Sequence, residues 1–504
     1  MAGKTKMFYF SKSKYCLVWQ CPKLLWLSKY KPELKSEDPS LQARFDEGNV
    51  VGDLAMGLFG DFTEVTAFKE DGRLDLNTMQ QLTKECIATS VENICEASFN
   101  YNGLYCAVDI LHRENGGYAI YEVKSSTHAS RVYAADISYQ KYVLEHCGVT
   151  VTGTYLICID SDYVREKELD IHKFFQIIDL SAEVEDELQN VPSLLKKAEQ
   201  VYGSTEEPQR DIGLYCRDPY DCGFWGYCTA HLPTPNVFDL YRIGFKSALQ
   251  YYSEGKASYR DVTFDSRMTN PKQLRQILHH INDQEAHIDR DGIRDFLDTL
   301  SYPLYFLDFE TMQPVVPQFE RTQPYAQIPF QYSLHYIEYE GGPLLHKEFL
   351  AESGTDPRRA IAERLCEDIP KDVCVTAYNK GFECSRIKEL AACFPDLAEH
   401  LLNIEGNIKD LLTPFRSGHY YNKAMGGSFS IKSVLPALFP DEPTLNYHNL
   451  EQIHNGTEAM GIFPKIKDMP PEEQVSTRHN LLKYCELDTY AMVKVWEKLK
   501  EAVT

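Results

Sequence analysis

The chain has 504 residues, too many for one ordinary hydrophobic core, so two or three domains are expected. Its composition is 43% hydrophobic, 12% aromatic and 25% charged, with no apolar run long enough to cross a bilayer, which predicts a globular protein without a membrane role. The net charge of −22 argues against indiscriminate binding of nucleic acid, because affinity for the phosphate backbone comes from lysine and arginine. It does not exclude an enzyme that acts on phosphates, since divalent cations invert the local charge of clustered carboxylates.

The N-terminus, MAGKTKMFYFSKSKYC, has basic residues but no apolar core followed by a small-residue cleavage site. No secretory signal is therefore expected, and the cytoplasm is the expected compartment. In that compartment the 15 cysteines of the chain are expected to be free thiols or metal ligands rather than disulfides.

The first half of the chain predicts helices followed by an α/β core. Residues 1 to about 100 have apolar positions at helical spacing, and a β-hairpin is expected over residues 104–126, where RENGG supplies the turn. A helix ended by Gly148, a strand over residues 151–159 and polar helical sequence up to about residue 205 follow. Strands interleaved with helices indicate an α/β domain over residues 1–235.

The second half predicts a helical connector and then a second α/β domain. Residues 236–300 alternate helical and turn-like sequence, and a new domain is expected over residues 301–504. It begins with the buried strand LYFLDFET, continues as an antiparallel meander through IPFQYSLHYIEY and PLLHKEFLA, adds the strand VCVTAY, and ends in a helix from about Pro471 to Ala502. This order of strands and helices is that of a ribonuclease H-like domain.

Three polar residues on the expected hairpin suggest a first catalytic site. Asp109 ends one strand, and Glu122 and Lys124 lie two apart on the next, so their side chains leave the same face. The spacing Asp-x12-Glu-x-Lys is that of PD-(D/E)xK nucleases, in which carboxylates hold a divalent cation and the lysine orients water or offsets charge on the phosphate. The plainer interpretation, which would be preferred for Glu-x-Lys alone, is a solvated strand edge.

With these residues, the first 232 residues resemble RecB-like nucleases that carry an iron–sulfur cluster. The resemblance implies that Glu96 is an additional metal-binding acid and that Gln140, on the following helix, belongs to the catalytic set. RecB-like members often have a histidine in a Gly-x3-His pattern before the hairpin, whereas here Gly48 is followed at that distance by Gly52.

In those families one N-terminal cysteine and three C-terminal cysteines bind a 4Fe–4S cluster that joins the two ends of the domain. The resemblance assigns these roles to Cys21, Cys216, Cys222 and Cys228. Four thiolates can also hold zinc, but zinc sites usually contain a closely spaced pair such as Cys-x2-Cys. Zinc is therefore the alternative metal, and Cys16 is an alternative fourth ligand.

A second set of acids lies in the last domain. Asp308 and Glu310 are two apart on an otherwise apolar strand, where adjacent buried acids are costly unless a cation meets them. Tyr484 and Asp488 are four apart on the last helix and share one face. Each pair also occurs by chance, but their order and separation are those of tyrosine-type DEDD exonucleases of the DnaQ-like superfamily, which the domain resembles.

The resemblance implies that the acids hold two metal ions and that the tyrosine positions the attacking water. The family expects an aspartate after Asn379 and Phe382, where this chain has Glu383, and Asp410 is a competing candidate. In GGSFSIK, residues Ser428, Ser430 and Lys432 are possible phosphate contacts, or else the segment is a glycine-rich turn before a helix.

The sequence thus predicts a two-site nuclease that requires magnesium or manganese. The last domain and the connector resemble a bacterial family of uncharacterised DnaQ-like domains that often follow RecB-like ones. The expected substrate is DNA with a free end or single-stranded DNA, digested from the 3′ end by the last domain. Two alternatives are an exonuclease acting on RNA and a nucleic-acid-binding scaffold in which only the C-terminal site is active.

Overall fold

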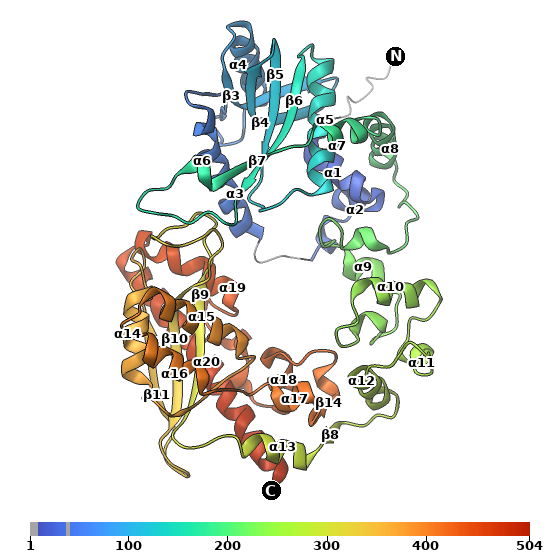
Figure 1. Cartoon of the computed structure of the whole chain (residues 1–504). Coiled ribbons are helices and arrows are strands. Elements are labelled where there is room, and N and C mark those ends of the chain that lie inside the picture. The colour runs from blue at the N-terminus through green and yellow to red at the C-terminus, as the bar shows by residue number, and fades with distance from the viewer. Residues whose placement is uncertain (1–8, 37–40) are drawn as a thin grey trace. The chain divides into compact units, whose positions relative to one another are not determined.

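The structure, a computed structural model, describes residues 9–36 and 41–504, except for the side chain of residue 448. The first eight residues of the expected N-terminal segment lie outside the described residues. The chain is a mixed α/β protein made of two compact units (Figure 1). Unit 1 contains Met1–His231 and Pro314–Tyr325, and unit 2 contains Leu232–Gln313 and Ala326–Thr504. The connector expected over residues 236–300 thus belongs to unit 2.

Unit 1 is built on a seven-stranded sheet with the order β2-β3-β4-β5-β6-β7, and β1 pairs with β4. The predicted hairpin is confirmed as β4 and β5, which pair in antiparallel fashion. Asn115 and Gly116, both with positive φ, form its tight turn, as hairpin turns require. The strands of this sheet are β1 (Phe10–Ser11), β2 (Thr63–Glu64), β3 (Asn93–Tyr101), β4 (Leu104–Glu114), β5 (Gly117–Val123), β6 (Val151–Ile159) and β7 (Phe175–Asp179).

The strand β3 corrects the expectation of helix up to about residue 100. Its residues Ile94 and Cys95 pair with β4, and both faces of the strand are buried, so no polar–apolar alternation marks it in the sequence. The pairing skips Glu96, which lies opposite Asp109 and has a φ of 58°. The register is the same on both sides of Glu96, so this is a local backbone irregularity without an extra residue, which the sequence pattern does not reveal.

One face of the unit 1 sheet is covered by α5 (Arg131–His146), which contacts β3, β4, β5 and β6 (Figure 1). Tyr139 on this helix donates a hydrogen bond to the carbonyl of Phe10 at 2.8 Å, and its ring stacks on Tyr15 of α1. The other face packs on α3. The helices of this unit are α1 (Lys12–Gln20), α2 (Pro22–Tyr30), α3 (Leu41–Met56), α4 (Leu76–Ala88), α5, α6 (Ile171–Phe174), α7 (Ser181–Leu188), α8 (Val191–Gly203) and α9 (Trp225–Thr229).

The segment Pro314–Tyr325, which follows the first strand of the second domain, completes unit 1. Arg165 exchanges backbone hydrogen bonds with Arg321 and Thr322, and its guanidinium donates to the carbonyl of Pro317 at 2.7 Å. Tyr325 donates to the carbonyl of Ser125, next to Lys124. This loop, which connects two strands of unit 2, is thus a structural part of unit 1. The expected domain boundary at residue 301 instead places it in the second domain.

Unit 2 contains a five-stranded sheet with the order β11-β10-β9-β12-β13. The predicted meander is confirmed, because β9, β10 and β11 pair in antiparallel fashion, and β12 and β13 add in parallel. A separate two-stranded sheet joins the connector to the second domain through β8 and β14. The strands are β8 (Ala286–Ile288), β9 (Leu304–Met312), β10 (Ile328–Ile337), β11 (Leu345–Leu350), β12 (Cys374–Ala377), β13 (Ile408–Asp410) and β14 (Tyr420–Asn422).

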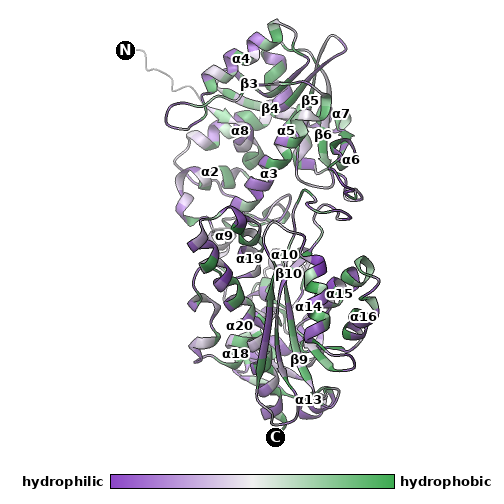
Figure 2. Cartoon of the chain, turned by 90° about the vertical axis from the view of Figure 1, so that its left-hand side faces the viewer, coloured by the Kyte–Doolittle hydropathy of each residue, from purple (hydrophilic) through white to green (hydrophobic). Residues whose placement is uncertain are grey.

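Helices cover both faces of this sheet. Figure 2 shows α14, α15 and α16 on one side of β9 and β10, and α18 and α20 on the other. Leu307 and Phe309 of β9 are buried in the core under α14 and α15, as expected for residues that alternate with the two acids. The helices are α10 (Phe245–Ser253), α11 (Tyr259–Val262), α12 (Pro271–Ile281), α13 (Arg290–Leu297), α14 (Arg358–Asp368), α15 (Gly381–Cys393), α16 (Ala398–Gly406), α17 (Thr413–Ser417), α18 (Ile431–Leu438), α19 (Gly456–Ile462) and α20 (Pro471–Val503).

Short 3-10 turns complete the two units. They are η1 (Pro32–Leu34), η2 (Gly57–Phe59), η3 (Leu214–Cys216), η4 (Val237–Asp239), η5 (Lys423–Met425), η6 (Pro443–Leu445), η7 (Tyr447–Asn449) and η8 (Phe463–Asp468). Across the part of the chain that the structure describes, none of the helices combines the length and the apolar character that a bilayer span needs.

Candidate functional site

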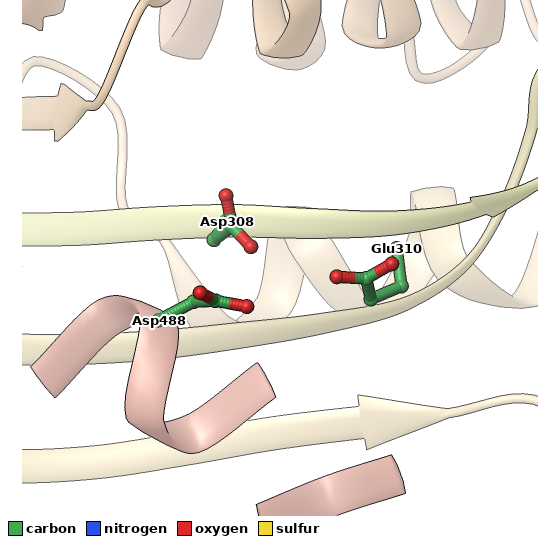
Figure 3. Close-up of side chains that lie close together, drawn as sticks. All are labelled: Asp308, Glu310 and Asp488. Atoms are coloured by element: carbon green, nitrogen blue, oxygen red, sulfur yellow. The ribbon is translucent and has the colours of Figure 1, made fainter. Parts of the chain in front are cut away.

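Three carboxylates meet between the sheet and the last helix of unit 2. Asp308 and Glu310 come from β9 and Asp488 from α20, and Figure 3 shows their carboxylates pointing toward one another. One ligand atom from each lies within 4.8 Å of the others, which among the described residues makes this the group of acidic, histidine and cysteine side chains best placed to hold a cation. Glu310 and Asp488 are each 8% exposed.

Hydrogen bonds between β10 and α20 set this geometry. In the strand register, Asp308 lies opposite Ser333 and Glu310 opposite Gln331, so the four side chains share the face that α20 covers. The amide of Gln331 donates to the carbonyl of Leu481 at 2.8 Å, and the hydroxyls of Ser333 and Thr489 are 2.6 Å apart. These contacts place the next turn of α20, with Tyr484 and Asp488, against the acids of β9.

Burial and mutual repulsion make the charged forms of these acids costly. The pKa of Asp308 is raised well above its ordinary value by burial and by the nearby charges of Asp488, Glu383 and Glu310. Burial and Asp488 likewise raise the pKa of Glu310. Burial raises the pKa of Asp488 to about 6, although hydrogen bonds from tyrosines and the charge of Lys432 oppose the shift. Such a set of acids is stabilised by a cation of high charge.

Two tyrosines and one lysine surround the carboxylates. Tyr447 donates to Asp488 Oδ1 at 2.7 Å, and its ring centroid lies 6.0 Å from that of Tyr484. The ammonium of Lys432, on α18, lies 5.5 Å from the ring centroid of Tyr447 and 5.9 Å from that of Tyr484. Tyr447 was not predicted, because it lies in a 3-10 turn of irregular sequence far from either motif. Lys432 was predicted as a phosphate contact and here lies beside the acids.

Gly456, the first residue of α19, closes the site on one side. A side-chain carbon at this position would lie 3.4 Å from Glu310 Oε2 and 4.0 Å from the hydroxyl of Tyr484. The glycines Gly426 and Gly427 are needed for other reasons. A side chain at Gly427 would collide with the backbone carbonyl of Asp239 at 2.1 Å. Gly427 is therefore required by packing and Gly426 by its positive φ of 57°, in agreement with a glycine-rich turn before a helix, and Ser428 donates a hydrogen bond to Ser430 at 3.2 Å.

The two candidates for the middle acid differ in their hydrogen bonds. Glu383, at the start of α15, is 3% exposed, and its Oε2 has no hydrogen-bond partner among the described residues. Asp410 has both oxygens engaged: Oδ1 accepts from the backbone N–H groups of Asn379 and Leu412, and Oδ2 pairs with Arg416. Burial raises the pKa of Glu383 to about 8. A buried carboxylate with one unpaired oxygen, close enough to Asp308 to raise its pKa, fits a cation site, whereas Asp410 holds the ends of β12 and β13 together.

These shifts predict how the stability of the metal-free protein depends on pH. Folded Asp488 and Glu383, with pKa values of about 6 and about 8, keep protons that the unfolded chain releases near pH 4. Unfolding therefore releases protons, and the contribution of these groups to stability falls as pH rises from about 4 to about 8. Calorimetric unfolding with a chelator should show this fall, and saturating Mn²⁺ should reduce it. A Glu383→Gln protein should show a flatter dependence, and an unchanged slope would contradict the assignment.

In unit 1, the residues predicted from the hairpin are brought together beneath α5. The carboxylate of Glu122 is fully buried and accepts from Lys124 and, at 2.7 Å, from the amide of Gln140. Asp109 Oδ2 accepts from the backbone N–H of Val123 at 2.7 Å. Glu96 lies opposite Asp109 in the β3–β4 pair, and burial together with the charge of Asp109 raises its pKa to about 7.

Two further residues belong to this group and were not predicted. The ammonium of Lys12, at the start of α1, lies 3.0 Å from Glu122 Oε1 and 3.8 Å from Asp109 Oδ1. Asp136 on α5 lies 3.3 Å from the ammonium of Lys124. Asp136 is four residues before Gln140, so helical spacing offered a signal for it. Nothing in the sequence marks Lys12, because its partners Asp109 and Glu122 lie about a hundred residues further along the chain.

Lys12 and Lys124 stabilise the charged form of Glu122 more than that of Asp109. Burial opposes the charge of Glu122, but Lys12 and Lys124 outweigh it and lower the pKa of this carboxyl. Asp109 has fewer stabilising contacts, and burial and the charge of Glu122 raise its pKa to about 6. The first group of acids is therefore partly neutralised by the chain itself.

The four cysteines predicted as ligands line one cavity in unit 1. Cys21 ends α1 and precedes α2, and the other three come from the loop over residues 213–232. Gln20 fastens this loop by donating to the carbonyls of Tyr215 and Tyr220, both at 2.8 Å. Burial raises the pKa of Cys216 to about 11. Cys16 does not line this cavity and lies instead near Asp136 and Lys124.

Comparisons with known proteins match parts of the chain. A family described as a domain of unknown function, DUF2779, matches residues 305–430, which hold Asp308, Glu310, Glu383 and Asp410 but not Tyr484 or Asp488. An uncharacterized protein of Mycoplasma pneumoniae, the MG366 homolog, is 25% identical over 239 residues, 44% of this chain and 36% of its own length. The uncharacterized protein UU173 of Ureaplasma parvum is 27% identical over 237 residues, 41% of this chain and 32% of its own length. The chain thus spans about a third of the curated relatives it matches.

Proposed function

We propose that the chain is a metal-dependent nuclease with two sites, and that unit 2 digests DNA from the 3′ end. The observation that carries this proposal is the meeting of Asp308, Glu310 and Asp488 within 4.8 Å, and Glu383, whose Oε2 has no hydrogen-bond partner, is close enough to raise the pKa of Asp308. Four carboxylates of this kind are a site for two divalent cations, which is the arrangement of DEDD exonucleases. The strand order of unit 2, with a three-stranded meander followed by two parallel strands, supports a ribonuclease H-like domain.

Each residue of the second site has a role in phosphodiester hydrolysis. Asp308, Glu310, Glu383 and Asp488 would hold the cations. When bound, magnesium or manganese supplies Lewis-acid stabilisation of the phosphate and a water of lowered pKa. The hydroxyl of Tyr484, beside Asp488, orients the attacking water, and the ammonium of Lys432 attracts the phosphate backbone of the substrate.

We infer that unit 1 is a second, RecB-like nuclease head. Asp109, Glu122 and Glu96 would bind a cation, Lys124 would act on water and phosphate, and Gln140 holds Glu122 in place. Cys21, Cys216, Cys222 and Cys228 would bind a 4Fe–4S cluster. Support comes from the common cavity that the four cysteines line.

The substrate expected for both sites is DNA that offers a free end or a single strand. The protein carries a net charge of −22, so its contacts with phosphate must be local, through cations such as Lys432 and the bound metals. With magnesium or manganese, the wild-type protein should digest an end-labelled DNA oligonucleotide faster than a matched RNA oligonucleotide. Faster digestion of RNA would make RNA the substrate, and no digestion of either polymer would contradict the proposal.

The activity of the first head can be isolated from that of the second. Digestion by an Asp308→Ala protein is expected to fall further when Lys124→Ala is added, because Lys124 contacts Glu122 at the centre of the first site. An Asp308→Ala protein whose residual digestion does not change with Lys124→Ala would indicate that unit 1 binds nucleic acid without cleaving it.

Removing the hydroxyl of Tyr447 tests how Asp488 is positioned. Tyr447→Phe is expected to slow 3′–5′ digestion about tenfold, because the carboxylate loses a hydrogen bond worth on the order of 1.4 kcal/mol. The matched control is Tyr490→Phe, also a tyrosine on the α20 side of the sheet, whose ring lies 5.9 Å from His335. The test compares the initial rates and the Mn²⁺ affinities of wild type, Tyr447→Phe and Tyr490→Phe. Equal rates for Tyr447→Phe and wild type would exclude the positioning role.

A further inference from the structure

Lys12 lies where a cation would bind in the first site. Its ammonium is 3.0 Å and 3.2 Å from the two oxygens of Glu122, and 3.8 Å from Asp109 Oδ1. It therefore contacts both carboxylates that the hairpin contributes to the cation site. Ammonium and divalent metal ions compete for the same carboxylate lone pairs, so the two cannot occupy this place together.

The position of Lys12 is fixed by the fold and not by a mobile surface segment. Lys12 is the first residue of α1, directly after β1, which pairs with β4 beside Leu104 and Tyr105. The ring of Tyr15, one turn further along α1, stacks on Tyr139 of α5 with 5.0 Å between the centroids. The backbone of Lys12 is thus held against the same helix that covers Glu122.

The side chain of Lys12 can nevertheless move away from the acids into solvent. It is 24% exposed, whereas the side chain of Glu122 is fully buried. A lysine has a flexible four-carbon stem, so its ammonium can turn toward solvent while the helix stays in place. Lys124 contacts Glu122 and Asp136, whereas Lys12 is the lysine that contacts both Glu122 and Asp109.

The two candidate sites differ in whether a lysine already forms ion pairs with their acids. In the second site, the nearest cation to the acids is Lys432, whose ammonium faces the rings of Tyr447 and Tyr484, and no ion pair joins it to Asp308, Glu310 or Asp488 in the described part of the chain. The acids of the second site are therefore left for metal ions to neutralise. Those of the first site are already neutralised in part by Lys12.

We propose that Lys12 is a built-in counter-ion that must leave Glu122 and Asp109 before a metal ion binds the first site. This inference rests on the proposed function of unit 1 as a metal-dependent head. It follows that the first site binds metal more weakly than the second. Between the two affinities there is a range of metal concentrations in which only the second head is loaded.

The test is Mn²⁺ binding to a protein whose second site is disabled by Asp308→Asn and Asp488→Asn. In this background Lys12→Gln is expected to tighten Mn²⁺ binding by about tenfold or more, because a positive charge within 4 Å of the ligands is removed. Lys12→Arg, which keeps the charge, should bind as weakly as the parent. Lys14→Gln is the matched control: it lies on the same helix, but its ammonium contacts Tyr202.

Thermal unfolding gives a second measurement that does not depend on catalysis. Without metal, Lys12→Gln should melt below the parent, and saturating Mn²⁺ should raise its melting temperature more than that of the parent. Equal or weaker Mn²⁺ affinity in Lys12→Gln would overturn the role of Lys12 while leaving a metal site in unit 1. No Mn²⁺ binding by any of these proteins would overturn the metal site of unit 1 and this inference with it.

Discussion

Replacing Asp308 by asparagine is expected to slow 3′–5′ digestion by about a thousandfold or more. Asparagine has the shape of aspartate but lacks its charge, so the fold should persist while one shared ligand of the cation site is lost. The group that remains, Glu310 and Asp488, no longer has three carboxylates within 4.8 Å. Initial rates in magnesium and in manganese, together with the number of Mn²⁺ ions bound per chain, measure the effect.

Glu383 and Asp410 provide a matched pair for the same assay. Glu383→Gln should cause a loss of the same order as Asp308→Asn, because Glu383 has a buried oxygen without a partner and its charge acts on Asp308. Asp410→Asn should reduce stability through its lost pairing with Arg416 but retain most of the rate per folded molecule. The opposite result, with Asp410 essential and Glu383 dispensable, would assign the middle position to Asp410.

Replacing Cys21 by alanine is the second change with a large expected effect, which is the loss of the cluster and of stability in unit 1. Cys21 and Cys216 are far apart in sequence, and a cluster that joins them closes a loop of almost two hundred residues. By the chain-entropy argument, closing a loop of that length stabilises a fold by about 5 kcal/mol. Cys21→Ala protein, purified without oxygen, should lose the absorbance and iron of the cluster and melt at a markedly lower temperature.

Two other cysteines are the controls for this experiment. Cys16→Ala should keep the iron, because Cys16 lies near the first site and outside the cavity of the four ligands. Cys147→Ala should also keep it, since Cys147 is exposed on the far end of α5. Zinc in place of iron in the wild-type protein would support the alternative metal. Wild-type protein that contains neither metal would contradict the ligand assignment.

The sequence predicted those parts of the fold that local pattern determines. The hairpin of β4 and β5, the meander of unit 2 and the helix α20 follow from glycine turns, apolar strands and helical spacing. The strand β3 was missed because both of its faces are buried, so no polar–apolar alternation marks it. The position of Pro314–Tyr325 in unit 1 was missed because it depends on long-range backbone hydrogen bonds.

The candidate sites follow the same division. The acids of both motifs could be found because strand and helix periodicity places them on common faces, as with Asp308 and Glu310. The residues that complete the sites could not. Lys12 and Tyr447 reach their partners only through tertiary folding, from the first helix and from an irregular turn. The preference for Glu383 over Asp410 rests on which carboxylate already has hydrogen-bond partners, and only the folded structure reveals this.

The central claim, that unit 2 is a 3′–5′ exonuclease, is tested most directly by end-labelled DNA and two variants. Single-stranded DNA labelled at its 5′ end is incubated with manganese and the wild-type, Asp308→Asn or Glu122→Gln protein. The account predicts a ladder of products shortened from the 3′ end for wild type and for Glu122→Gln, and no such ladder for Asp308→Asn. A ladder that persists in Asp308→Asn, or that disappears only in Glu122→Gln, would contradict it.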